Sequence, residues 1–135
     1  MESDAASGFS AFPTERQIDL WSGIGLGCGY TGGVSREALE RLRHASGPYL
    51  SQIAVGVAIA AHARRLAHTP APYAELASEV LCGTSIDEAA HIVEGAFKDV
   101  PTTGTKPAYQ IWREHIEEQL ATFVGNGVEK KTQIA

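Results

Sequence analysis

The sequence predicts an all-α fold, a compact bundle of about six helices around an apolar central helix. Strand signals are missing, because no alternating run of β-branched and aromatic residues is bounded by turn residues. Helical spacing of apolar residues recurs instead, and glycine, proline or serine separates one such segment from the next. Residues 45–63 contain no Asp, Glu, Lys or Arg. A helix over this stretch needs cover on several sides, so we expect it at the centre.

The first two helices are predicted from Pro13 and from Ser35. Proline suits the first position of a helix, and Ser35 is a typical N-cap residue. The first helix runs into four alternate glycines, from Gly23 to Gly29. Each glycine costs a helix interior about 1 kcal/mol relative to alanine. We therefore expect another helix, or a ligand, to approach the backbone closely along this run.

Four more helices follow. The central one is predicted from Tyr49 to about Leu66, and the next begins at Thr69-Pro70 and ends at Cys82-Gly83. Ser85 and Glu88 have the spacing of a capping box, which predicts another helix through Phe97. The last helix is expected over 107–124, after a loop at 101–104. The predicted organisation is a flexible N-terminus at 1–11, a single helical domain at 12–126 and a flexible tail at 127–135.

Composition excludes several classes of protein. The chain has 135 residues and a net charge of −5, which argues against nucleic-acid binding. Residues 45–63 are too polar to span a membrane, and residues 1–10 show no signal-peptide pattern. The two cysteines, Cys28 and Cys82, lie in apolar surroundings and predict buried, reduced thiols. We therefore expect a cytoplasmic protein with no nucleic-acid partner and no membrane association.

Two motifs match cofactor sites on paper only. Residues 27–32 read G-x-G-x-x-G, but the preceding segment is predicted as helix, whereas the dinucleotide motif follows a strand. Glu88 and His91 have the spacing of a di-iron ligand pair, but a di-iron site needs a second such pair, which the chain lacks. The sequence thus predicts neither a cofactor nor a metal.

The candidate site residues are one histidine and a set of aromatic side chains. His62 lies on the charge-free helix and could be a general base, or simply a histidine where that helix emerges into solvent. Aromatic rings could line a pocket for a flat apolar ligand, beside the room that the glycines leave. The predicted catalytic residues are His62 and Tyr49. The predicted ligand-binding residues are Trp21, Gly25, Tyr30, Tyr73 and Trp112.

Several stretches resemble a known family. They are Asp19–Leu26 with Gly32-Gly33, Gly47–Leu50, Val80–Gly83 followed by Asp87–Ala90, and Tyr109–Arg113. In this order they resemble the C-terminal part of a family of unknown function that is encoded in the shared gene cassette of enediyne antibiotic clusters. The resemblance covers most of residues 12–118, so we expect this chain to hold only that segment. It implies a pathway, the maturation or tailoring of an enediyne polyketide, and transfers no catalytic residue.

Three functions fit these observations. The first is a cofactor-independent tailoring enzyme, an oxygenase or a cyclase/isomerase, that acts on an apolar polyketide or anthraquinone-like intermediate. Such an enzyme needs a base, a polar anchor and a dry pocket. The second is a protein that binds or sequesters the same class of apolar aromatic or polyene molecule. The third is a structural subunit of a pathway complex, with an exposed apolar stripe. The glycine run also makes a homodimer conceivable.

Overall fold

The computed structural model describes residues 13–30, 34–68, 72–98 and 107–124, and these residues form helices without any strand. The helices are α2 (Thr14–Tyr30), α3 (Arg36–Ser46), α4 (Leu50–Ala67), α5 (Pro72–Ala77), α6 (Ile86–Lys98) and α7 (Ala108–Val124). A 3-10 turn at Gly47–Tyr49 leads into α4, and a π-helical turn at Ser78–Cys82 extends α5. The predicted all-α bundle is confirmed. The expected loop at 101–104, the termini at 1–11 and 127–135, and the start at Thr69-Pro70 lie outside the described residues.

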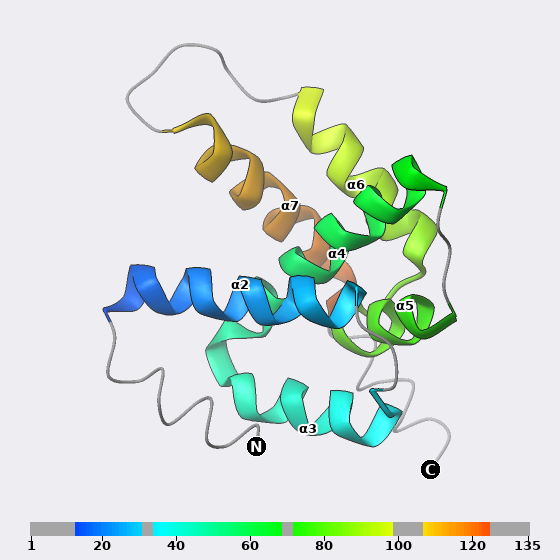
Figure 1. The fold of residues 1–135 in the computed structure, drawn as a ribbon. Helices are drawn as coiled ribbons and strands as arrows, with labels where there is room; N and C mark the ends of the chain where they lie inside the picture. Colours follow the sequence, from blue (N-terminus) through cyan, green and yellow to red (C-terminus); the bar gives the residue numbers. More distant parts are fainter. Residues whose placement is uncertain (1–12, 31–33, 69–71, 99–106, 125–135) are drawn as a thin grey trace.

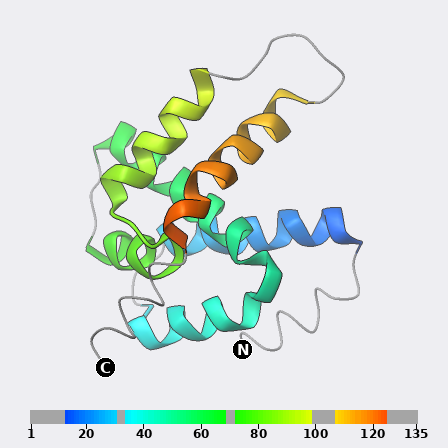
Figure 2. The same ribbon diagram turned by 180° about the vertical axis from the view of Figure 1, so that it is seen from behind.

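Helix α4 is the centre of the bundle, as the charge-free stretch predicts. It packs against α2, α6 and α7. In Figure 1, α2 crosses in front of α4 and α7 lies behind it, and Figure 2 shows the reverse order from the other side. Helices α6 and α7 lie side by side in both views. The apolar residues of α4 are therefore covered from two opposite directions.

The helix starts follow the serine signals in the sequence. The hydroxyl of Ser35 accepts a hydrogen bond from the Ala38 N–H at 3.1 Å, and that of Ser85 accepts one from the Glu88 N–H at 3.1 Å. A carboxylate of α5 also contributes, because Glu75 Oε2 accepts from the Ile86 N–H at 3.2 Å. Each bond satisfies an N–H that has no partner within its own helix.

The crossing of α2 over α4 explains half of the glycine run. A Cβ atom added at Gly25 would overlap the carbonyl oxygen of Ile53, and one added at Gly29 would overlap the Cβ of Ala60. On the other helix, a Cβ at Gly56 would overlap the carbonyl oxygen of Ser22. The other half of the run faces away from α4, since a Cβ at Gly23 would meet nothing within 4 Å. Close packing of another helix thus accounts for Gly25 and Gly29.

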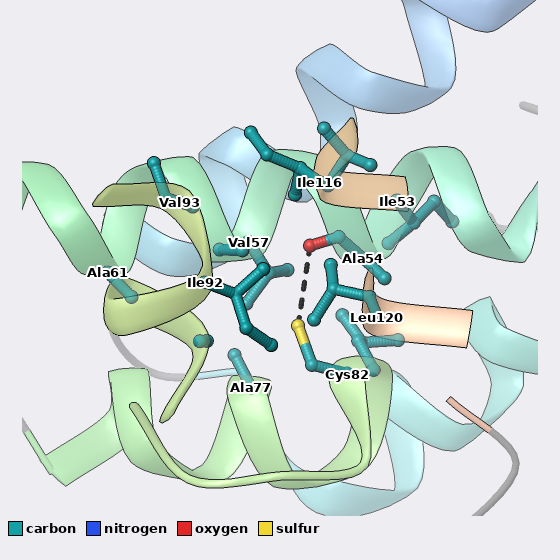
Figure 3. Close-up of a cluster of buried hydrophobic side chains, with 14 of the residues drawn as sticks. Ile53, Ala54, Val57, Ala61, Ala77, Cys82, Ile92, Val93, Ile116 and Leu120 are labelled. Carbon is teal, nitrogen blue, oxygen red and sulfur yellow. Dashed lines mark hydrogen bonds between the residues drawn. The ribbon is translucent and has the colours of Figure 1, made fainter. Parts of the chain in front are cut away.

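The side of α4 opposite α2 is covered by the π-helical turn and by α7. Cys82 is fully buried there, and its Sγ donates to the carbonyl oxygen of Ala54 at 3.3 Å (Figure 3). Burial raises the pKa of the Cys82 thiol to about 12. Both cysteines are free thiols, and the predicted burial is confirmed for Cys82, whereas Cys28 is only half-buried. No helix of the described residues has the length and apolarity that crossing a membrane requires.

Candidate functional site

Four rings from three helices form a continuous series that we call the aromatic ladder: His62, Phe97, Trp112 and Tyr109. Phe97 and Trp112 stack closely, with ring centroids 4.5 Å apart and planes at 22°. His62 lies 6.0 Å from Phe97, and Tyr109 lies 5.7 Å from Trp112, both tilted. These separations are those of interacting aromatic pairs. The ladder therefore runs from α4 over the end of α6 to the start of α7.

The ladder is held at its centre and exposed towards its sides. The Trp112 indole is half-buried and its Nε1–H donates to the carbonyl oxygen of Val93 at 3.3 Å, which fixes α7 against α6. Phe97 is 53% exposed and Tyr109 is 58% exposed. Because both rings contact Trp112, they form one exposed apolar patch, the kind of surface that makes a binding-site candidate.

The other predicted aromatic residues form a separate pair. Trp21 and Tyr49 stack nearly parallel, with centroids 6.3 Å apart and planes at 13°. Trp21 is only 2% exposed and is part of the core. Beside it on α2, Gly25 faces the backbone of α4, so the space that its missing side chain leaves is filled by protein.

The two predicted catalytic residues lie at opposite ends of α4. Tyr49 immediately precedes the helix and His62 lies in its C-terminal part. At 1.5 Å per residue, the helix separates their backbones by about 20 Å. One small substrate group cannot contact both side chains, so His62 and Tyr49 do not form a base and anchor for the same atom. The side chains of Tyr30 and Tyr73 lie outside the described part of the structure.

Beside the ladder lies a cleft of about 570 Å³ between α2, α4 and α7, which we call the acidic cleft. Its lining combines four carboxylates, two amides, one guanidinium and a few apolar surfaces. The lining residues are Glu15, Asp19, Glu114, Glu117, Gln52, Gln110, Arg113, Ile18, Pro107 and Tyr109. Because Tyr109 belongs to both features, the ladder leads directly into the cleft.

Arg113 is the most constrained group of the acidic cleft. Its side chain is only 13% exposed, and its Nη1 donates to Asp19 Oδ1 at 2.8 Å. The guanidinium carbon lies 5.6 Å from the centre of the Tyr109 ring, a cation–π distance. Nη2 is buried and finds no hydrogen-bond acceptor among the described residues. A buried donor of this kind is costly, and its place in a cleft marks the cleft as a binding site candidate.

Sequence reasoning missed Arg113 and the cleft. A signal was present, because Glu15 and Asp19 are four residues apart, and Glu114 and Glu117 are three apart. Each pair therefore lies on one face of its helix. What the sequence did not contain was the crossing angle that brings the start of α2 to the start of α7.

A second cavity, of about 480 Å³, lies between α6 and α7. It contains Glu88 and His91, the two residues with the spacing of a di-iron ligand pair, together with His115 and Glu118 of α7. Within the described ranges, no three side chains of His, Cys, Asp or Glu are placed to hold a metal ion. The groove is polar and water-facing, and its charged lining is an ordinary solvated surface between two helices.

Comparison with known proteins adds a family and no activity. No curated protein matches the chain, and no solved structure does. One family model, described as a protein of unknown function (DUF1702), matches residues 3–120. The match covers far more than half of the sequence and includes the helices of the ladder and the cleft. The chain therefore belongs to the DUF1702 family of proteins of unknown function.

Proposed function

We propose that this protein binds a flat, conjugated, apolar small molecule on the aromatic ladder. The observation that carries the proposal is the stacked series of rings itself, with Phe97 and Tyr109 more than half exposed at either side of Trp112. A planar ligand can extend this series by lying against the exposed faces or edges. Aromatic side chains suit such a role because each has only two rotatable torsions and loses little entropy on binding.

The resemblance to the enediyne cassette family supports a particular class of ligand. We propose an intermediate of an enediyne-type polyketide pathway, handled in the cytoplasm. Polyene and fused-ring intermediates of such a pathway are flat and apolar, which is the shape the ladder fits. Binding without turnover, as in sequestration of a reactive product, requires nothing beyond the ladder.

A catalytic role is the second candidate, and the position of His62 favours it. The His62 ring is 6.0 Å from Phe97, so a ligand stacked at that end of the ladder lies beside a possible proton acceptor. The protein would then be a cofactor-independent oxygenase or a cyclase/isomerase, with His62 as the base. Tyr49 cannot be its anchor, because it lies at the far end of α4.

Fluorescence of the two tryptophans tests binding directly. Trp21 is buried beside Tyr49 and Trp112 is on the ladder, so a Trp21→Phe variant reports on Trp112 alone. Anthracene, a flat fused-ring hydrocarbon, should quench this emission saturably. In the same background, Phe97→Ala should weaken binding about two- to tenfold, since it removes a stacking partner worth about 0.5–1.5 kcal/mol.

The matched control is Leu26→Ala. Leu26 is 37% exposed and lies on α2, a helix that contributes no ring to the ladder, so its loss removes apolar surface away from the ladder. Equal weakening in both variants would reduce the proposal to nonspecific hydrophobic adsorption. A rise in molecular mass on light scattering that Phe97→Ala abolishes would instead identify the ladder as a homodimer or partner interface.

Turnover separates the two candidate functions. Extract from a strain that lacks this gene is incubated with protein in air, and the products are analysed by mass. A new mass that disappears with His62→Ala, while anthracene binding is retained, would support catalysis. A compound that is retained on the protein without any change in mass would support binding alone.

A further inference from the structure

The acidic cleft next to the ladder suggests what functional group the ligand carries. We infer that Arg113 receives an uncharged carbonyl oxygen of the ligand, so that the ligand is a neutral aromatic ketone, quinone or amide rather than an acid or an amine. This inference rests on the proposed function, because the ring of the ligand occupies the ladder while its oxygen enters the cleft.

The first step is the unused donor. One nitrogen of the guanidinium, Nη1, is paired with Asp19, while Nη2 is buried without an acceptor among the described residues. A buried charged donor is stabilised by any oxygen that reaches it. Arg113 lines the cleft and only 13% of its side chain is exposed, so the cleft is the route by which we expect an oxygen to approach Nη2.

The second step is the charge around that donor. Asp19 already neutralises Arg113, and the described lining of the cleft contains three further carboxylates, Glu15, Glu114 and Glu117. A ligand carboxylate would meet an excess of negative charge there. A ligand ammonium would be attracted by the carboxylates but could accept nothing from Nη2. A carbonyl oxygen is an acceptor without charge, and it fits both conditions.

The third step is access. Nη2 is covered in this structure, and the ring of Tyr109 lies over the guanidinium at 5.6 Å. Tyr109 is 58% exposed and is the second residue of α7, so displacing its ring disturbs little else. The ligand would take the place of this ring against Trp112 and extend its oxygen to Nη2. The same displacement joins the ladder and the cleft into one continuous site.

A set of four naphthalenes that share the fused ring system and differ in the substituent tests the inference. They are 2-acetylnaphthalene, its smaller analogue without the oxygen, 2-ethylnaphthalene, and the charged compounds 2-naphthoate and 2-naphthylmethylammonium. Binding is measured by Trp112 quenching in the Trp21→Phe background. We expect the acetyl compound to bind at least about tenfold more tightly than the ethyl compound, which is the lower end of the gain from a hydrogen bond to a charged donor. The ethyl compound is the more apolar of the two, so hydrophobicity alone would give the opposite order.

Two arginine variants test whether Arg113 causes the preference for the acetyl compound over the ethyl compound. Arg113→Met should abolish the preference for acetyl over ethyl while ethyl binding persists. Arg36→Met is the matched control, since Arg36 also pairs with a carboxylate, Glu79 at 3.0 Å, but does not line the cleft. It should keep the full preference. Circular dichroism checks the folding of each variant. If Arg113→Met unfolds, the order of the four affinities for the protein with Arg113 intact still tests the inference.

Each contrary outcome has its own meaning. Equal binding of acetyl and ethyl compounds, still weakened by Phe97→Ala, would overturn the carbonyl inference and leave the ladder as the binding site. Tightest binding of the ammonium would show that the carboxylates select the ligand, and tightest binding of the naphthoate would show that Arg113 acts as a simple anion site. Either result overturns the inference. Failure of all four to bind would overturn the proposed function together with it.

Discussion

Helices α2 and α4 pack closely where they cross, whereas α6 and α7 meet at a contact that we call the seam and that is packed in the opposite way. At the crossing, Gly25, Gly29 and Gly56 remove side chains so that two backbones meet. At the seam, Phe97 stacks on the half-buried Trp112 at 4.5 Å and is itself 53% exposed. Close backbone packing tolerates no inserted atom, whereas an exposed ring can be removed or covered at small cost. The comparison teaches that the crossing excludes added atoms, whereas the seam leaves ring surface exposed.

The largest effect is expected from breaking the crossing. Gly25→Ala places a Cβ against the carbonyl oxygen of Ile53, a backbone atom that cannot move aside. We expect a loss of about 3 kcal/mol in the free energy of unfolding, at the upper end of overpacking costs. Urea denaturation measures it.

Gly23→Ala is the matched control on the same helix. A Cβ there meets nothing within 4 Å, and alanine restricts the unfolded chain. This variant should therefore be more stable by ~0.5–1 kcal/mol. Similar behaviour of Gly25→Ala and Gly23→Ala would mean that α2 does not cross α4 at these residues.

The same comparison shows how far the sequence could lead. Charge-free residues 45–63 predict the central helix, and Ser35 and Ser85 predict the starts of α3 and α6 from local chemistry alone. The glycine run predicts a close approach, but all four glycines look alike in the sequence. Only the rotation of α2 about its axis separates Gly25 from Gly23. That rotation is a tertiary property, which local propensity does not encode.

The candidate site was less predictable for a related reason. Trp21, Tyr49, His62 and Trp112 were proposed together because their residue types suit one pocket. The structure divides them between the Trp21–Tyr49 pair and the ladder. Phe97, which connects His62 to Trp112, looks in the sequence like one more apolar residue at helical spacing. It lies near the end of α6, where Trp112 and His62 contact its ring but leave it 53% exposed.

The pH dependence of stability sharpens the comparison, because it tests the side of α4 on which Cys82 is buried. The Cys82 thiol, with an ordinary pKa of 9.0, has its pKa raised to about 12 by burial. Between these values the unfolded chain loses a proton that the folded chain keeps, so stability falls as pH rises above 9. This thiol alone should contribute a loss of up to ~1.4 kcal/mol per pH unit.

Cys82→Ala provides the reference for that slope. Other groups titrate in the same range, so the quantity to compare is the fall in unfolding free energy from pH 8.5 to pH 10.5 in both proteins. The fall should be smaller in Cys82→Ala, whatever the baseline cost of the substitution. Parallel curves would show that the thiol is not sealed in the folded chain. A thiol reagent at pH 8 should also label Cys28, which is half-buried, before Cys82.

Removal of an aromatic ring from the ladder should lower the stability less than Gly25→Ala does. Phe97→Ala removes a ring that is already 53% exposed, so we expect a loss of about 1 kcal/mol, the contribution of one aromatic pair. Ile116→Ala, in the core on α7, should cost several times more, because it leaves a cavity. If the two losses were equal, Phe97 would be a core residue and the seam could not serve as an open binding surface.

The smallest effect on stability is expected at the acidic cleft, where α2 of the crossing meets α7 of the seam. Asp19 of α2 and Arg113 of α7 pair at 2.8 Å across the acidic cleft, and Asp19 is largely exposed. Asp19→Asn should lower the unfolding free energy by ~1 kcal/mol or less, because Asp19 is largely exposed and the asparagine oxygen can still accept from the buried Arg113, and 1 M salt should narrow the difference. Glu79→Gln, which breaks the exposed pair with Arg36, should behave alike. A loss well above 1 kcal/mol for Asp19→Asn alone would mean that the pair locks α2 to α7. The cleft would then be a rigid part of the stable half of the molecule, and Tyr109 could not move aside without unfolding the start of α7.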